Sequence, residues 1–570
     1  MSQPSGFNLE KWRFPIAMVL SFAIILGWVW FTQKNAPAQK PTPAAAPLAA
    51  GVSNLTAAVS AVSPMAPVAV MAAPAEKAIP AKLAVLENDD LRITLSSRGG
   101  VVVSNLYKKS PKGSFVDFEE GSLSNHHCGS LIFGNKLDQT PLDQAFELSE
   151  SSPRHQVWRA RIEQAGAAYD LVKRYDLNSN DLKLTLRMEH RVGPGLQGSL
   201  MLLNGSSIGP SLPADKRTSF DVLTAARVTG NSYNVALAPG MFSSTSKYET
   251  HPATEWIALH SRYYFKALRP DQGGAVAHFL AKHDSVTNLP VGGYEVPFTL
   301  AAGGVYESRF TYSFLPKDRS LLSKLTDATG IQFYKIFDQY EIMYLLANAM
   351  YYPMTFINGF VKNYGITILI LTLFLKMITW PLNQKSLVTM QKMQSLKPKI
   401  DEIQKSYKGD AQKINQATMA LYQKEKVNPL SGCLPMLIPM PVFFALYSLF
   451  RNMIEMDLQS FLWIKDLSLP DMAFLLPFEI PFIGHYVNLL PIIMTLTQVL
   501  QSVRTPQPDA SANSTQTFIF KYIFPFMFLF ILWSMPSALV LFWTLQNIVS
   551  WLQAEWVRSR KNRAVAAPSR

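Results

Sequence analysis

The chain has 570 residues, of which 48% are hydrophobic and 16% are charged, and its formal net charge is +13. A chain of this length exceeds the size at which a single core stops growing, so at least two folded units are expected. The hydrophobic residues gather in long uncharged runs, which is typical of a membrane protein. Lysines and arginines flank these runs, so contact with anionic phospholipids explains the charge better than direct nucleic-acid sequence recognition.

The N-terminal region, residues 1–35, contains an uncharged run from Phe14 to Phe31 that follows two basic residues. At about 1.5 Å per residue, this run is nearly long enough to span a bilayer. A removed signal peptide is the alternative, but bulky aromatic residues at the end of the run favour a retained transmembrane anchor. Residues 36–82 are rich in Ala and Pro, which predicts a flexible linker.

Residues 83–325 contain short runs in which apolar and polar residues alternate, separated by turn signals. Leu182, Leu184 and Leu186, for example, are separated by single polar residues. A period of two predicts strands with one buried face, and the number of runs predicts a large antiparallel β-sandwich.

Two cysteines, Cys128 and Cys433, lie in different settings, so no disulfide is expected. The sequence His126-His127-Cys128 could contribute metal ligands, but it lacks a second ligand pair at the spacing of a zinc site. We therefore expect a polar loop here and no metal.

Residues 326–362 connect the β region to the later apolar runs. Apolar residues between Ile342 and Phe360 follow helical spacing, with polar residues on most of the other side. This pattern predicts an amphipathic helix lying in the membrane interface, and a buried helix of a soluble domain is the alternative.

Residues 363–557 hold the remaining apolar runs. The last run exceeds the length of one span and is interrupted at Met535-Pro536-Ser537, which predicts two short antiparallel helices. Together with the N-terminal anchor, these runs predict six transmembrane helices. The runs are Ile366–Pro381, Leu434–Phe450, Phe482–Val503 and Ile519–Leu552.

The charged residues indicate the topology. Residues 383–429 carry nine lysines against four acidic residues, whereas residues 451–482 carry two basic residues against five acidic ones. By the positive-inside rule, both termini, residues 383–429 and the basic tail 558–570 lie in the cytoplasm. The β-sandwich then lies in the periplasm of a bacterium, and the helices lie in its inner membrane.

Residues 383–429 also repeat apolar side chains in steps of three and four along two arms. This predicts an antiparallel helical hairpin that projects into the cytoplasm. It could dock a ribosome, a nascent chain or anionic lipid, or it could be a solvated loop.

Polar stripes mark three of the predicted spans and predict a hydrated groove that opens to the cytoplasm. Lys376 lies about 7–8 Å inside the end of its span if the helix ends at Pro381. Each stripe alone could reflect hydrogen bonds between helices, and the lysine alone could extend to the lipid headgroups. The candidate groove residues are Thr372, Lys376, Thr379, Gln498 and Asn547.

Catalysis has little support in the sequence. It has no P-loop, no Gly-x-Ser-x-Gly motif and no His-Glu-x-x-His pair, so we expect no enzyme activity, no catalytic residue and no cofactor. The pattern alone is also compatible with a transporter, with a lipid- or glycan-handling protein whose periplasmic domain binds sugars, or with a structural assembly factor.

Several segments of the C-terminal part, in this order, resemble the YidC/Oxa family of membrane-protein insertases. The N-terminal anchor, linker and β domain resemble the Gram-negative YidC branch of that family. The matching segments are Thr372 to Leu382, Leu396-Lys397-Pro398-Lys399, Asn428 to Pro435, Met440-Pro441 and Pro536 to Leu541.

The resemblance implies a five-helix core around a hydrophilic groove that is open to the cytoplasm and to lipid. It also implies that nascent membrane proteins are the substrates, that the Sec translocon and the ribosome are partners, and that no nucleotide is bound. Three positions depart from the family pattern: the usual groove arginine is Lys376, a usual glutamine is Pro439, and the aromatic residues associated with substrate contact are Phe542 and Trp543. Lys376 keeps the charge but lacks the planar donor fork of arginine.

Overall fold

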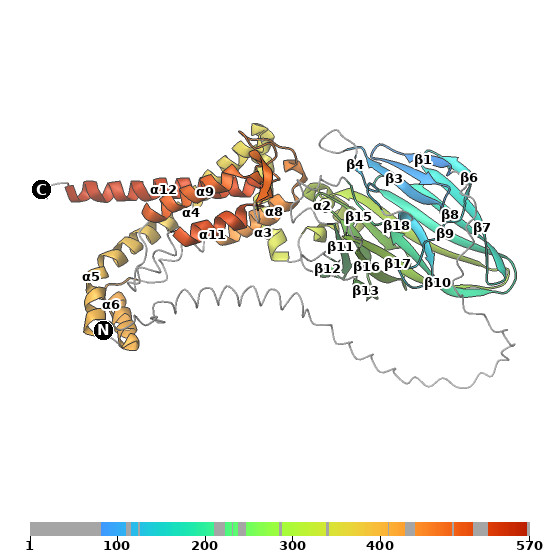
Figure 1. Ribbon diagram of the computed structural model, residues 1–570, viewed down its shortest axis with the longest axis horizontal. Coiled ribbons are helices and arrows are strands. Elements are labelled where there is room, and N and C mark those ends of the chain that lie inside the picture. Colours follow the sequence, from blue (N-terminus) through green and yellow to red (C-terminus); the bar gives the residue numbers. More distant parts are fainter. Residues whose placement is uncertain are drawn as a thin grey trace.

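A computed structural model gives the fold of a β domain and a helical bundle that follow one another along the long axis of the molecule (Figure 1). The predicted N-terminal anchor and the predicted linker up to residue 80 lie outside the described residues, as does Leu434 to Ile438 of the second predicted core span. The structure describes residues 81–109, 116–122, 126–209, 223–230, 232–237, 247–283, 288–337, 341–407, 410–427, 439–480, 484–504 and 522–566.

The β domain consists of two packed antiparallel sheets, as predicted, and each has nine strands among the described residues. The first sheet contains β1 (Leu83–Glu87), β2 (Leu91–Ser96), β3 (Val101–Tyr107), β5 (Cys128–Phe133), β10 (Leu196–Asn204), β17 (Asn288–Leu300), β16 (Val276–His283) and β13 (Lys247–His251) in this spatial order, with β4 (Val116–Asp117) beside β3. The second contains β12 (Ser232–Leu237), β11 (Thr224–Thr229), β14 (Trp256–His260), β15 (Tyr264–Pro270), β18 (Val305–Pro316), β9 (Asp181–Val192), β8 (Ala167–Leu177), β7 (His155–Gln164) and β6 (Glu147–Ser152).

The predicted alternation places one face of β9 in the core. Leu182 and Leu184 are buried and lie opposite Tyr312 and Phe310 of β18, whereas Lys183 points outward. This matches the period of two that a half-buried strand requires.

Two helical elements connect the β domain to the bundle. Helix α2 (Arg319–Thr329) begins at Asp318, whose carboxylate accepts hydrogen bonds from the backbone of Ser320 and Leu321. The 3-10 helix η2 (Phe333–Ile336) then packs beside Trp256 of the sheet.

The bundle contains the helices α3 (Glu341–Val361), α4 (Tyr364–Ser395), α8 (Pro439–Asn452), α9 (Leu489–Arg504), α11 (Phe524–Leu532) and α12 (Ser537–Ala566). Among the described residues, α4 alone is long and apolar enough to cross a membrane by itself, and α9 is a shorter apolar helix. Helix α12 packs against both α9 and α4, whereas α3 packs against α8 and α4. The α8–α9 connection, residues 453–488, contains the 3-10 helix η4 (Ile454–Met456) and the strand pair β19 (Phe474–Ile480) and β20 (Gly484–Val487).

The structure corrects three predicted element boundaries. Helix α4 continues through Pro381 to Ser395, because a proline removes only one helical hydrogen bond and flanking turns can carry the helix past it. The third predicted core span does not start at Phe482: Gly484–Val487 is a strand, and α9 begins at Leu489. The last apolar run divides near Pro536 as predicted, but unequally, into nine residues of α11 and 30 of α12.

The helical hairpin predicted within residues 383–429 is present over a shorter segment. It consists of α5 (Lys397–Ser406) and α6 (Ala411–Lys424), because the first part of the predicted arm belongs to α4. Ile400 and Tyr422 pack together between the two helices. The hairpin lies at the end of the bundle that faces away from the β domain (Figure 1).

Helix α3 turns the predicted apolar face outward. Leu345, Phe356 and Phe360 are exposed, whereas Ala347 and Met354 are buried against the bundle. An exposed apolar face argues against the alternative of a buried helix, and the location of this helix in the membrane interface stays a prediction.

Arg262 joins the β domain to the bundle. This buried side chain follows β14, and its guanidinium donates hydrogen bonds to the backbone carbonyls of Arg451, at 3.1 Å, and Ser468. Ile454 of the α8–α9 connection also packs into the core of the sandwich. The bundle is therefore held against the β domain by backbone-directed hydrogen bonds and by apolar contact.

Candidate functional site

Three helices of the bundle begin at one common level. Gly365 near the start of α4 lies so close to Phe461 that a Cβ atom there would overlap the ring. The backbone amides of Leu490 in α9 and Ser537 in α12 bond the same α8–α9 connection, through Asp471 at 2.9 Å and Leu469 at 2.8 Å. Distances along these helices can therefore be compared.

The predicted polar residues lie at similar depths below that level. At about 1.5 Å per residue, Lys376 lies about 18 Å along α4, Asn547 about 15 Å along α12 and Gln498 about 14 Å along α9. The stripes therefore match in depth, as predicted. Because α4 extends beyond Pro381, Lys376 lies nearer the middle of its helix than predicted.

Lys376 is enclosed between α4 and α12. Its side chain is 6% exposed, and Nζ donates a hydrogen bond of 2.7 Å to Oγ of Ser550 in α12. The Ser550 hydroxyl in turn donates to the carbonyl of Gln546, at 2.6 Å. The lysine is thus held by a neutral acceptor, the Ser550 hydroxyl.

Further polar side chains of α4 and α12 form hydrogen bonds near this contact. Thr372 is buried and bonds the carbonyl of Ile368, while Thr379 accepts a hydrogen bond of 3.4 Å from Asn383. On α12, Gln553 is buried and donates to the carbonyl of Trp380, at 3.4 Å.

Asn547 and Gln498 lie on the side of α12 and α9 where these helices meet. Asn547 is buried and donates to the carbonyl of Met494 in α9, at 3.4 Å. The side-chain oxygen of Gln498 is buried without a hydrogen-bond partner. A buried acceptor without a partner is costly, so Gln498 can gain from a donor supplied by a bound molecule.

We call this set of side chains the polar seam. It consists of Thr372, Lys376, Thr379, Asn383, Gln498, Asn547, Ser550 and Gln553. Sequence reasoning missed Ser550 and Gln553 as members, although Asn547, Ser550 and Gln553 follow one another in steps of three and so share a helix face.

The predicted substrate-contact residues Phe542 and Trp543 have different surroundings. Phe542 is 1% exposed in the core of the bundle. Trp543 is partly buried between Phe443 of α8, with ring centroids 5.0 Å apart, and Phe528 of α11, at 5.4 Å. In this conformation, therefore, Trp543 alone of the pair borders the space between α8 and α11.

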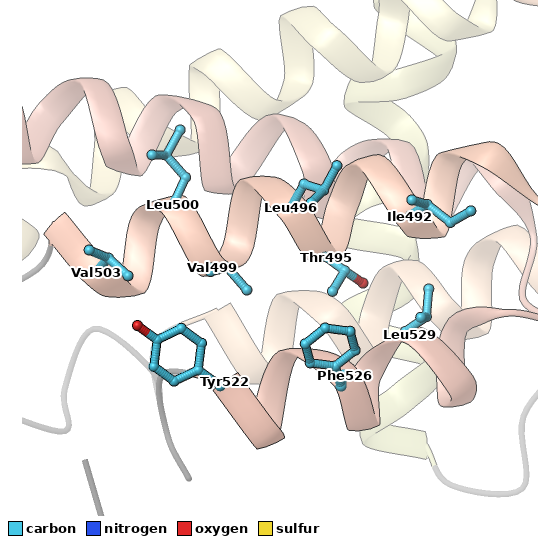
Figure 2. A pocket seen from close by; sticks show the side chains of 9 residues that line it. All are labelled: Ile492, Thr495, Leu496, Val499, Leu500, Val503, Tyr522, Phe526 and Leu529. Atoms are coloured by element: carbon cyan, nitrogen blue, oxygen red, sulfur yellow. The ribbon is translucent and has the colours of Figure 1, made fainter. Parts of the chain in front are cut away.

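An apolar cavity lies on another side of the bundle, between α9 and α11. Its volume is about 550 Å³. Thr495 and Val499 of α9 face Tyr522 and Phe526 across the gap (Figure 2). Such a lining favours an apolar occupant over a polar one.

His126 and His127 lie in an irregular segment before β5, as predicted for a loop, but the segment is packed: His126 is buried and His127 is partly buried. Cys128 begins β5 and is inaccessible, because the chain enters the sandwich core there. Nearby, the fully buried Lys266 and Glu119 form an ion pair of 2.6 Å, and His127 lies 3.3 Å from the same carboxylate. Burial raises the pKa of Glu119, but the Lys266 ammonium and the hydrogen bonds from Lys266, His127 and Cys128 together outweigh this effect and hold the pKa below its ordinary value.

The structure thus defines a class: a large antiparallel β domain joined to apolar helices that share a buried polar seam. Residues 356–564 match the family described as 60Kd inner membrane protein. A membrane protein insertase YidC of Pelodictyon phaeoclathratiforme is 28% identical over 502 residues, which cover 85% of this chain and 84% of that protein. Another from Syntrophobacter fumaroxidans is 33% identical over 318 residues, 55% of each chain.

A crystal structure described as an active YidC insertase with the first transmembrane domain resolved is 18% identical, with a TM-score of 0.34, and the match covers 83% of this chain and 93% of that one. The chain belongs to the YidC/Oxa family of membrane-protein insertases. It is accordingly a membrane protein, and its family is not an enzymatic one.

Proposed function

We propose that this protein is a membrane-protein insertase that passes nascent polypeptides from the cytoplasm into the bacterial inner membrane. Its homologues carry that name, and the observation that supports a path for a polypeptide is the polar seam inside an apolar bundle. Buried polar residues among membrane helices are costly and therefore mark functional sites.

The orientation follows from charge and arrangement. The hairpin α5–α6, with its excess of lysines, and the end of α12 lie away from the β domain (Figure 1). Together with the positive-inside rule, these features support a cytoplasmic position for the hairpin and both termini and a periplasmic position for the β domain. We also propose the predicted division into an anchor (1–35), linker (36–82), β domain (83–325), connecting helix (326–362), five-helix core (363–557) and basic tail (558–570), with six transmembrane helices in all.

The polar seam is closed in this conformation, so insertion requires α4 and α12 to separate on their cytoplasmic side. Lys376 then loses Ser550 and needs another acceptor, which backbone carbonyls or acidic side chains of an entering segment can supply. Gln498 gains a donor from the same segment. Water that enters with the substrate completes the hydrated groove, which opens to the cytoplasm.

Short helices reduce the distance that a polar segment must cross. Helix α9 has 16 residues, which corresponds to about 24 Å, against a typical hydrocarbon core of about 30 Å. This mismatch favours local thinning of the bilayer. An apolar substrate helix then moves into lipid past Trp543, where burial in hydrocarbon drives its release.

The partners that we propose follow from the surface of the hairpin and from the family. Exposed lysines on α5 and α6 can contact a ribosome or anionic phospholipids. The Sec translocon is a second partner, since the family works alone or beside it. We propose no cofactor and no catalytic residue.

Depletion of the native protein followed by complementation tests this function. Cells that receive the wild-type chain should insert short single-span proteins, and cells that receive Lys376→Glu should accumulate them outside the membrane. Equal insertion with both proteins would contradict the role of the seam, and failure of the wild-type chain to restore insertion would contradict the function itself.

A further inference from the structure

The α8–α9 connection exposes large apolar side chains beyond the ends of the membrane helices. Five such residues are each at least 59% exposed, although the segment lies between the bundle and the β domain rather than along a helix flank. Exposed apolar clusters of this kind mark an interaction site. The five are Leu458, Leu462, Phe474, Leu475 and Phe478.

The connection is nevertheless fixed firmly to the bundle. Asp471 accepts hydrogen bonds from the backbone amide of Leu490, at 2.9 Å, and from the indole of Trp463, at 3.1 Å. The amide of Ala538 in α12 bonds the carbonyl of Leu467, at 2.9 Å, and Leu467 is fully buried. The first turns of α9 and α12 therefore fix the position of the connection along the bundle axis.

The length of α9 then determines where this connection lies in the bilayer. Its 16 residues are about 6 Å too short for a typical hydrocarbon core of about 30 Å. With its cytoplasmic end at the inner boundary, its first turn lies about 6 Å short of the outer boundary of such a core, so the attached connection lies within the outer leaflet close to the headgroups. At this depth the pairing of β19 with β20 and the nearby water can satisfy the backbone, which the middle of the hydrocarbon would not allow.

Backbone strain and the placement of charge are consistent with this location. Leu458, Leu462 and Met472 have left-handed backbone conformations, with φ of 57°, 53° and 40°. A residue other than glycine there costs about 1–2 kcal/mol, and such strain clusters at functional segments. Two acidic side chains of the connection, Asp466 and Asp471, are buried, so they do not repel anionic lipid headgroups.

We infer that the exposed apolar side chains of the α8–α9 connection insert into the outer leaflet, so that a phospholipid surface is the partner of this segment. The inference rests on the membrane-spanning bundle proposed above. The connection thereby anchors the closed end of the bundle and keeps the bilayer thin beside α9.

Spin labels at single cysteines test this inference in proteoliposomes of bacterial phospholipid with the full chain. Cys433 is replaced by Ser, and Cys128 stays because it is inaccessible. Labels go on Leu462→Cys and Leu475→Cys, and relaxation is compared for oxygen, which concentrates in lipid, and for a water-soluble nickel chelate. Met377→Cys of α4 and Val192→Cys of the β domain, both similarly exposed, are the lipid and water controls.

The labels at positions 462 and 475 should show an oxygen-to-nickel ratio several times that at position 192 and near that at position 377. A ratio equal to that at position 192, with position 377 still lipid-exposed, would overturn the inference while leaving the span intact. If the nickel chelate reaches position 377, α4 does not span the membrane there. That result would also contradict the orientation on which both proposals depend.

Discussion

The ammonium of Lys376 in α4 donates a 2.7 Å hydrogen bond to the hydroxyl of Ser550 in α12, two residues that lie 174 positions apart in the sequence. This contact links two helices inside an apolar bundle through one charged and one neutral group. The contact lies near the middle of both helices, which makes the pair the natural point at which the seam opens.

Substitutions at Lys376 should show whether insertion depends on the positive charge of this side chain or on its shape. Lys376→Arg keeps the charge and should retain most insertion activity, whereas Lys376→Met should reduce insertion of substrates with polar outer segments by about tenfold, the effect of losing one charged hydrogen bond. Pulse-labelling with protease protection measures this. Ser550→Ala is the matched control, because it removes the partner and leaves the charge; a loss as large as that of Lys376→Met would contradict the role given to the charge.

Arg262 should determine how firmly the bundle is held to the β domain. Arg262→Ala leaves the carbonyls of Arg451 and Ser468 without this donor and should cost about 1–3 kcal/mol. The thermal midpoint in detergent should fall by several degrees. The control is Arg309→Ala, an exposed arginine paired with Glu307, for which no comparable change is expected. Equal midpoints for both variants would show that Arg262 does not carry the junction.

The buried pair of Glu119 and Lys266 should behave differently from a surface pair. Glu119→Gln leaves the Lys266 charge buried without its counter-charge and should destabilise the β domain by about 3–5 kcal/mol. Combining it with Lys266→Met should restore most of that loss. Denaturant unfolding followed by tryptophan fluorescence measures both, and a double variant as unstable as Glu119→Gln would contradict this explanation.

The stability of the β domain should decrease in acid because of His260. Burial, together with the Lys317 ammonium, lowers the pKa of His260 well below 6.5, and its ring is held between Tyr233 and Lys317. Below pH 6.5 the unfolded chain binds a proton that the folded chain excludes, so the stabilisation present above that pH is lost as the pH falls. Melting between pH 7.5 and 5 measures the slope, and His260→Gln should flatten it. An unchanged slope in that variant would assign the acid sensitivity to other groups.

Much of the fold follows from periodicity. The alternation at Leu182, Leu184 and Leu186 predicts the half-buried strand β9, and the break at Pro536 predicts the separation of α11 from α12. Pro381 wrongly predicts the end of a helix. Helix α4 continues past it, because the hydrogen bonds of the many other residues of this helix compensate for the one that the proline removes. The strands β19 and β20 are missed because an apolar run before a helix reads as part of that helix.

The candidate site follows from the sequence only in part. The polar residues Lys376, Gln498 and Asn547 are recognisable because they interrupt apolar runs at helical spacing. Which helix faces which is a tertiary property, so the partner Ser550 and the burial of Phe542 could not be derived from spacing. The family resemblance identifies a polypeptide as the cargo, which no pattern of residues does by itself.

Photocrosslinking from within the seam tests the central claim most directly. A photoreactive amino acid replaces Gln498, whose buried oxygen lacks a partner, and the exposed Val305 of the β domain is the control position. With ribosome-bound nascent chains of a short membrane protein, position 498 should give polypeptide adducts and position 305 should give none. Adducts at position 498 only with lipid or small solutes, in a chain that still complements depletion, would contradict a polypeptide path through the seam and favour a transport function.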